Sequence, residues 1–123
     1  MSVRVFQYPK CSTCRNALKW LEARGVAYET IPIVEKPPSA AALRELHKRS
    51  GKPIAKFFNT SGESYRAGNF KEKLAKMSEA ECFEALAKDG KLIKRPLIDA
   101  GKAVLVGFDE AEYQATFSTQ KYS

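Results

Sequence analysis

The sequence predicts an α/β fold in which a β-α-β unit and a later β-hairpin with a helix contribute to one mixed sheet. Three observations carry this prediction. The chain opens with a strand-like, a helix-like and a second strand-like segment in succession, as in a βαβ unit. Two further strand-like segments near the C-terminus flank Ala100-Gly101, which is typical of a hairpin turn. The stretch between the β-α-β unit and the hairpin, about 37–91, has apolar residues at helical spacing and helix-capping residues, which indicates a helical insertion.

The first strand is expected over Val3–Phe6, where apolar residues alternate with polar ones. Residues 12–24 place apolar side chains at helical spacing, and Gly25 follows where a glycine commonly ends a helix. Residues 26–33 are expected to form the second strand. Strands joined through a helix pair in parallel, so these two should be parallel neighbours.

The insertion contains two helices whose starts are marked by serine. Ser39 follows two prolines and is expected to cap a helix that ends near Arg49. Ser78 and Glu81 form a capping box, which predicts a helix to about Lys88. Short helical pieces separated by loops are expected over 54–77.

The C-terminal part is expected to form a strand ending at Asp99, a strand over 103–106, and a helix over 110–116 that Asp109 caps. The chain has 123 residues, a length that suits one domain with its own core. We therefore expect residues 1–123 to form a single domain and the protein to be a monomer.

An ordinary composition and the lack of a recognisable signal region predict a cytoplasmic protein without a membrane partner. Hydrophobic residues make up 44% and charged residues 28%, both ordinary for a soluble domain. No run approaches the roughly 20 apolar residues of a membrane helix, and the N-terminus has no apolar signal region. A lasting structural disulfide is not expected in the cytosol.

The net charge of +7 has two interpretations. It can be a solvated basic surface, or it can attract an anion: an oxyanion, an acidic thiol such as glutathione, or an acidic protein surface. Direct binding of nucleic acid is not expected, because the basic residues are spread along the chain and no recognised nucleic-acid-binding motif occurs.

Cys11 and Cys14 have the spacing of a redox pair at the start of a helix. The free N–H groups and the dipole of the first turn favour a thiolate at Cys11, and Lys10, Arg15 and Lys19 add positive charge. Cys14 lies about one turn further on, where it can attack a mixed disulfide formed at Cys11. The pattern therefore predicts a nucleophile at Cys11 and a resolving thiol at Cys14.

Two alternatives apply to the cysteines. A zinc site needs four ligands, and only Cys82 and His47 remain, so no metal is expected. The pair could also be inert. Cys82 stands alone in a helical pattern, which predicts a small apolar core residue, while a third thiol that resolves a disulfide is the alternative.

Arg95-Pro96 precedes the third strand, where a proline can be a plain strand start and the arginine a surface residue. A pattern along the whole chain indicates a functional role for Arg95-Pro96. Four blocks occur in order along the chain: Tyr8–Asn16, Pro37–Ser39, Leu92–Leu97 and Val106–Phe108. In these blocks, nearly the whole chain resembles the arsenate reductase-like (ArsC/Spx) family of the thioredoxin superfamily.

The resemblance implies a thioredoxin/glutaredoxin-like mixed sheet with Pro96 as a cis-proline that faces the cysteines. Pro96 would offer a backbone edge to a bound thiol substrate, and Arg95 would point at the sulfur or at an oxyanion. In glutaredoxin-coupled arsenate reductases a cysteine matching Cys11 attacks arsenate, which three arginines bind. Only Arg95 matches one of them, because the others fall at about Asn59 and Gly107.

Spx-like regulators, in contrast, keep both cysteines, use their disulfide as a switch and bind the RNA polymerase α subunit. The loop Phe57–Gly62 looks more like that of a sister group named arsenate reductase-related, for which thiol reductase activity has been proposed. The resemblance therefore leaves an enzyme and a regulator as alternatives.

The leading prediction is a thiol–disulfide oxidoreductase with no bound cofactor, glutathione as co-substrate, and glutaredoxin or thioredoxin as the other partner class. Cys11, Cys14 and Arg95 would be catalytic. The residues expected to contact substrate are Lys10, Ser12, Thr13, Arg15 and Pro96. The alternatives are an arsenate reductase proper and an Spx-type regulator that binds the RNA polymerase α subunit.

Overall fold

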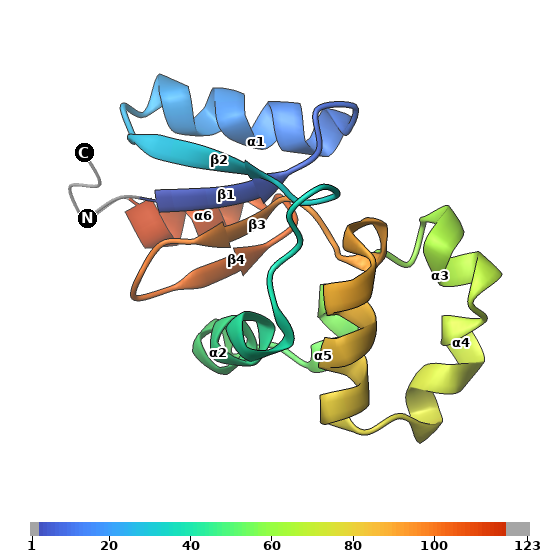
Figure 1. Cartoon of the computed structure of the whole chain (residues 1–123). Helices are drawn as coiled ribbons and strands as arrows, with labels where there is room; N and C mark the ends of the chain where they lie inside the picture. The colour runs from blue at the N-terminus through green and yellow to red at the C-terminus, as the bar shows by residue number, and fades with distance from the viewer. Residues whose placement is uncertain (1–2, 118–123) are drawn as a thin grey trace. The chain divides into compact units, whose positions relative to one another are not determined.

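The computed structural model describes residues 3–117 (Figure 1). Its internal contacts divide the chain into two compact units. The first, here called the sheet unit, combines the segments before Ile33 and after Lys94, and the second, the helical unit, spans Ile33–Lys94. Within residues 3–117, no helix is both long enough and apolar enough to cross a membrane.

The sheet unit contains a mixed four-stranded sheet in the order β2-β1-β3-β4. β1 pairs in parallel with β2, with Val5 opposite Thr30, and antiparallel with β3, with Val5 opposite Ile98. β3 and β4 form an antiparallel hairpin. The strands are β1 (Val3–Gln7), β2 (Tyr28–Pro32), β3 (Leu97–Asp99) and β4 (Val104–Val106). The predicted β-α-β unit and hairpin are thus confirmed, and with them the fold class.

Helices α1 (Ser12–Ala23) and α6 (Glu110–Phe117) belong to the same core. The ring of Trp20 on α1 meets that of Tyr113 on α6 edge-on, with 5.5 Å between centroids. The buried residues around them include Val5, Ala17, Leu21, Ile98 and Leu105. This core joins both helices to the central strands of the sheet.

The end of α1 explains why β2 is shorter than predicted. Gly25 has a left-handed φ of 71° and donates its N–H to the carbonyl of Glu22 at 3.1 Å. Val26 donates to the carbonyl of Leu21 at 3.0 Å, which completes a Schellman motif. The backbone of Val26 therefore closes the helix, and β2 begins only at Tyr28.

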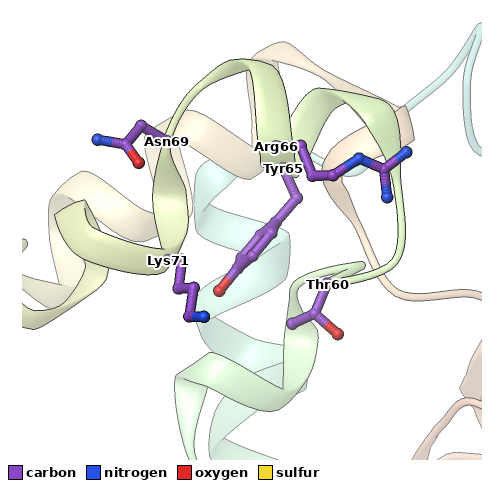
Figure 2. A pocket seen from close by; sticks show the side chains of 5 residues that line it. All are labelled: Thr60, Tyr65, Arg66, Asn69 and Lys71. Carbon is purple, nitrogen blue, oxygen red and sulfur yellow. The ribbon is translucent and has the colours of Figure 1, made fainter.

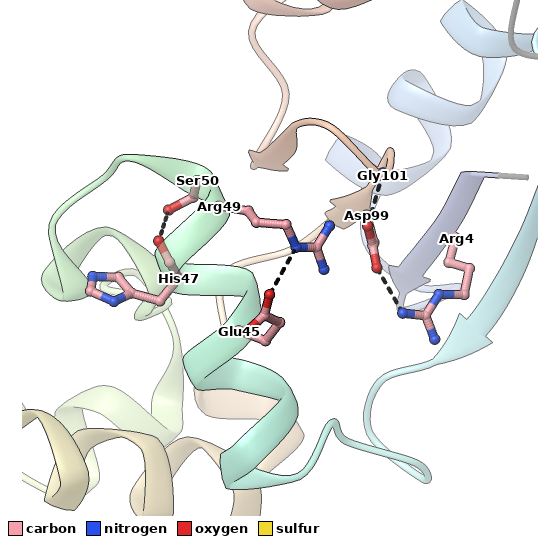
Figure 3. A network of polar contacts seen from close by, with 7 residues as sticks. All are labelled: Arg4, Glu45, His47, Arg49, Ser50, Asp99 and Gly101. Carbon is pink, nitrogen blue, oxygen red and sulfur yellow. Dashed lines mark hydrogen bonds and ion pairs between the residues drawn. The ribbon is translucent and has the colours of Figure 1, made fainter. Parts of the chain in front are cut away.

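An ion pair crosses the central strands of the sheet (Figure 3). Arg4 on β1 lies directly opposite Asp99 on β3, and its guanidinium donates to Oδ2 of Asp99 at 2.7 Å. Oδ1 of Asp99 accepts the backbone N–H of Gly101 at 3.0 Å. Asp99 is the buried polar residue of this region, and these two bonds satisfy its carboxylate.

The helical unit consists of short helices and turns. These are α2 (Ala40–Ser50), η1 (Ile54–Phe57), α3 (Glu63–Ala67), α4 (Phe70–Lys73), η2 (Leu74–Lys76), α5 (Glu79–Lys88) and η3 (Gly90–Leu92). Ser39 caps α2 by accepting the N–H of Ala42 at 3.1 Å, and Ser78 and Glu81 form the predicted capping box. The helical insertion is therefore confirmed, including both serine caps.

Helices α2 and α5 pack against each other in the helical unit. The imidazole of His47 lies between the rings of Phe57 and Phe83, with centroid distances of 5.7 and 5.6 Å. Cys82 on α5 is 1% exposed, which confirms the interpretation that it is a small core residue. On α2, Glu45 and Arg49 form a 3.7 Å ion pair, and the Ser50 hydroxyl donates to the His47 carbonyl (Figure 3).

The segment after α5 contains a close approach that the sequence did not indicate. Gly90 begins η3 and is buried. A Cβ at this position would lie 2.0 Å from the carbonyl oxygen of Ile33. Backbone atoms cannot move aside as a flexible side chain can, so this contact requires glycine.

Substituting Gly90→Ala should lower the free energy of unfolding by about 3 kcal/mol, the upper end of the usual cost of overpacking. Gly62→Ala is the control, because a Cβ at Gly62 would first meet the flexible amide of Asn59, at 2.6 Å. Urea unfolding followed by circular dichroism measures both. Equal losses in the two variants would contradict the proposed clash at Gly90.

Candidate functional site: the thiol pair of the sheet unit

The register of the sheet brings three distant segments to one edge. β1 and β3 are antiparallel, with Phe6 opposite Leu97, so the end of β1 lies beside the start of β3. Val106, at the end of β4, is opposite Leu97 on the other side. The segments that follow β1, precede β3 and follow β4 therefore meet at this edge, and they carry Cys11, Arg95 and Gly107.

Cys11 occupies the N-cap position of α1. Its N–H donates to the carbonyl of Tyr8 at 3.0 Å, which closes the turn between β1 and the helix. Its backbone is extended, at φ −92° and ψ 115°, and its Sγ accepts the N–H of Cys14 at 3.4 Å. The sulfur thus takes the place of the oxygen that normally caps a helix.

The two thiols differ in their exposure. Cys11 is partly exposed, whereas Cys14 is 0% exposed in the first turn of α1. A substrate can therefore reach the sulfur of Cys11 but not that of Cys14. This difference is compatible with the predicted roles, in which Cys11 attacks first and Cys14 acts in a step inside the protein.

The electrostatics at Cys11 favour its thiolate. Partial burial alone would raise the pKa of Cys11, but hydrogen bonds from the backbone and side chain of Cys14 and the positive charge of Arg95 outweigh it. The pKa of Cys11 is therefore lowered from the ordinary thiol value. The thiolate, which is the nucleophilic form, persists to lower pH than it would in a free cysteine.

The electrostatics at Cys14 work in the opposite direction. Burial raises the pKa of Cys14, and the neighbouring Cys11 sulfur raises it further. A second negative charge beside the Cys11 thiolate is unfavourable, so Cys14 stays a neutral thiol that donates to it. The pair therefore holds one thiolate and one thiol.

Arg95 acts on the thiol pair from the segment before β3, and its guanidinium lies against the ring of Tyr8. The Arg95–Pro96 peptide bond is cis, as the resemblance implied. The guanidinium carbon lies 5.0 Å from the centroid of the Tyr8 ring, within the range of a cation–π contact. Tyr8 thus helps to place the charge that lowers the pKa of Cys11, a role that sequence analysis did not assign.

Tyr113 supports the Pro96 segment from α6. Its buried hydroxyl donates to the carbonyl of Gly107 at 2.6 Å, and the N–H of Gly107 donates to the carbonyl of Pro96 at 2.8 Å. Gly107 has a φ of 79°, a conformation that favours glycine. Burial raises the pKa of Tyr113, so the hydroxyl remains a donor.

The remaining predicted site residues lie around the start of α1. Lys10, Ser12 and Thr13 are exposed, and Pro96 is buried. The guanidinium of Arg15 donates to the carbonyl of Pro9 at 2.9 Å, which directs it to the turn between β1 and α1. Among residues 3–117, no three His, Cys, Asp or Glu side chains are grouped so that they could hold a metal ion.

A thiol pair at the first turn of a helix, beside a cis-proline at the start of a neighbouring strand, defines a thioredoxin-like thiol protein. Comparison with known proteins specifies the family. The model of the ArsC family matches residues 6–116, nearly the whole chain, so the protein belongs to the ArsC family. The resemblance of the four sequence blocks to this family is thereby confirmed.

Individual relatives support this assignment. The chain is 51% identical over 118 residues to the uncharacterized protein YusI of Bacillus subtilis, covering 96% of this chain and 100% of YusI. An ArsC family related protein from Bacteroides fragilis superposes with a TM-score of 0.91 and 42% identity over 94% of this chain and 97% of that one. A "possible arsenate reductase" from Streptococcus mutans superposes with a TM-score of 0.86 and is 41% identical, over 94% of this chain and 98% of that one.

A more distant relative is named as a transcriptional regulator and not as a reductase. The global transcriptional regulator Spx of Listeria innocua is 26% identical over 110 residues, covering 89% of this chain and 82% of the regulator. Proteins similar to this chain thus include some named as reductases and some named as regulators, so the family alone does not fix the activity.

Substituting Arg95→Gln should raise the pKa of Cys11, because it removes a positive charge beside the thiolate. At pH 6 the reaction of Cys11 with iodoacetamide should slow several-fold, while at high pH the rates of variant and wild type should converge. Lys102→Gln, at an exposed turn, removes the same charge elsewhere and serves as control. An unchanged pH profile in Arg95→Gln would contradict the role of Arg95.

Substituting Tyr113→Phe removes one hydroxyl and leaves the ring contacts in place. The carbonyl of Gly107 then loses a buried donor, which should lower the free energy of unfolding by about 1–3 kcal/mol. In Tyr28→Phe the lost bond to Glu22 is exposed, so the loss should stay within about 0.5 kcal/mol. Urea unfolding measures both, and similar losses would argue against the Tyr113 bond.

Proposed function

We propose that the protein is a thiol–disulfide oxidoreductase that reduces disulfides with electrons from glutathione or from a dithiol protein such as glutaredoxin or thioredoxin. The observation that carries the proposal is the geometry of Cys11. Its partly exposed sulfur accepts the N–H of Cys14 and lies beside the charge of Arg95. This combination supports a stable, accessible thiolate.

The proposed reaction has two exchanges. The Cys11 thiolate attacks one sulfur of a substrate disulfide, the S–S bond of the substrate breaks, and one half leaves as a thiolate. Cys14 then loses its proton and attacks Sγ of Cys11, which releases the other half and forms the Cys11–Cys14 disulfide. Two glutathione molecules, or one dithiol partner, reduce this disulfide and are themselves oxidised to a disulfide.

The raised pKa of Cys14 fits this order of events. Part of the shift comes from the neighbouring Cys11 sulfur, after the larger effect of burial. When Cys11 is joined to substrate as a mixed disulfide, its sulfur carries no charge, and that contribution disappears. Cys14 therefore becomes easier to deprotonate at the step in which its thiolate is needed.

Disulfide reduction is favoured over arsenate reduction by the residues available for an oxyanion. Arg95 is the guanidinium that acts on Cys11, whereas Asn59 and Gly107 stand where the resembling reductases carry their other arginines. Bidentate, charge-assisted bonds from arginine are among the strongest contacts to an oxyanion. Their replacement by an amide and a glycine should weaken arsenate binding, while a disulfide substrate does not need them.

Single substitutions at the two cysteines should separate the two exchanges. Cys11→Ser should reduce the rate of glutathione-dependent disulfide reduction to background, because no accessible nucleophile remains. Cys14→Ser should still form a mixed disulfide but lack the internal resolving step, so that the adduct accumulates. A coupled NADPH assay with glutathione reductase gives the rate, and mass spectrometry of the intact protein detects the adduct.

Cys82→Ser is the matched control, because the buried Cys82 lies in the helical unit and takes no part in the proposed exchanges. It should keep the wild-type rate. Full turnover by Cys11→Ser would refute the oxidoreductase proposal. A Cys11–Cys82 disulfide in Cys14→Ser would instead show that Cys82 resolves the mixed disulfide.

A second candidate function is a redox-switched regulator, which the similarity to Spx supports. Here the Cys11–Cys14 disulfide would change the affinity for a partner, and the RNA polymerase α subunit is the partner that the resemblance implies. Binding of the purified α subunit to oxidised and to reduced protein tests this. Equal affinity in both states, or no binding, would leave the enzyme as the better description.

A further inference from the structure

The helical unit contains a basic pocket that the thiol chemistry does not use. It has a volume of about 350 Å³ and lies at α3, α4 and the loop before α3. The residues that line it are Thr60, Tyr65, Arg66, Asn69 and Lys71 (Figure 2). This site is here called the α3–α4 pocket. Its lining includes two cations and no carboxylate.

The two cations of the pocket have no anionic partner within residues 3–117. Lys71 and Arg66 are exposed, and neither forms an ion pair with a residue in this range. The guanidinium of Arg66 is held by a 2.9 Å bond to the carbonyl of Ser61. A cation that is oriented but not neutralised is well suited to a ligand that brings the negative charge.

The donors of the pocket lie on a rigid aromatic support. Figure 2 shows the ring of Tyr65 projecting with its hydroxyl toward the ammonium of Lys71, whereas the hydroxyl of Thr60 is directed away from both. The Tyr65 ring stacks on that of Phe70, with 6.2 Å between centroids, and Phe70 packs on the buried Phe58 at 5.7 Å. The ammonium of Lys71 and the phenol of Tyr65 therefore offer neighbouring hydrogen-bond donors, and the phenol is supported by the rings beneath it.

Basic and acidic residues of the helical unit are concentrated in different parts of its sequence, and the pocket lies in the basic part. Residues 48–76 contain eight basic and two acidic residues, a net charge of +6, almost the whole +7 of the protein. Residues 77–90 contain four acidic residues and one basic residue. The two acidic residues of the basic stretch, Glu63 and Glu72, lie on α3 and α4, and Glu72 accepts from the lining residue Asn69 at 3.3 Å. The excess of basic residues still favours anions and raises the rate at which an acidic partner associates.

We propose that the α3–α4 pocket is a docking site for an acidic segment of a partner protein, with Lys71 and Arg66 binding two of its carboxylates. Carboxylates fit the donors: Tyr65 supplies a hydroxyl group beside the ammonium of Lys71, and Arg66 provides a second positive charge in the lining. The site is independent of the thiol pair, so it holds whichever function Cys11 and Cys14 perform.

The test uses fluorescence anisotropy with a short fluorescein-labelled peptide that alternates Glu and Gly. The same peptide with Gln in place of Glu should not bind. Arg66→Gln combined with Lys71→Gln should weaken binding of the Glu peptide about tenfold, or about 1.4 kcal/mol. The control, Lys36→Gln with Lys88→Gln, removes the same charge from exposed positions outside residues 48–76 and should weaken binding less than about twofold.

A charge-preserving variant separates loss of the site from loss of the fold. Lys71→Arg should retain most of the affinity, and urea unfolding should give all variants the same midpoint within error. Equal weakening by the pocket and control variants would overturn the proposal, because diffuse charge would then explain binding. Tighter, pocket-dependent binding of a labelled single-stranded oligonucleotide would also overturn it and make the pocket a nucleic-acid site.

Discussion

The hydrogen bond from the N–H of Cys14 to the sulfur of Cys11 is the interaction on which the functional site depends. It caps helix α1 and stabilises a thiolate with the same atoms. Serine, threonine, asparagine and aspartate usually hold this position, and their oxygens satisfy the first turn in the same way. Because a sulfur does so here, the start of the helix cannot shift without displacing the nucleophile. One hydrogen bond therefore serves both the helix cap and the Cys11 sulfur.

The sheet provides the second half of the site through its register. The parallel β1–β2 pair anchors α1, but the antiparallel β1–β3 pair brings Arg95 from the far end of the sequence. If β3 slipped by one residue, every side chain along it would change face, and Arg95 would no longer be aimed as it is. The Arg4–Asp99 ion pair and the bond from Gly107 to Pro96 both oppose such a slip. The contacts that fix the register of the central strands thus also fix the position of the Arg95 charge that lowers the pKa of Cys11.

Local signals were enough to predict most of the secondary structure. Ser39, Ser78 with Glu81, and Gly25 each act on residues within one helical turn, so their consequences are visible in the sequence. The parallel β1–β2 pair followed from the βαβ rule and the β3–β4 pair from the hairpin, whereas the pairing of β1 with β3 came only from the structure. The start of β2 was predicted less well, because the amide of Val26 belongs to the cap of α1 although its side chain is typical of a strand.

The supports of the site were not predictable in the same way. Tyr8 contacts Arg95 and Tyr113 contacts Gly107, and both contacts exist only after the sheet and α6 have formed. A tyrosine in an otherwise ordinary pattern does not show which carbonyl or cation it will meet. The requirement for glycine at position 90 likewise comes from Ile33, far away in the sequence. Sequence identified the reacting atoms, and the structure identified what holds them.

In the proposed exchanges, the exposure of the two sulfurs would set the same order of attack for an enzyme and for a switch. Cys14 is fully buried, so an external thiol that reduces the Cys11–Cys14 disulfide must attack Cys11. Oxidation by substrate and reduction by a thiol then pass through mixed disulfides at the same sulfur. The site therefore determines the direction of approach and the order of exchange, but not how long the disulfide lasts. That lifetime depends on the supply and potential of the external thiols. A short lifetime gives an enzyme, and a long one gives a switch with the same geometry.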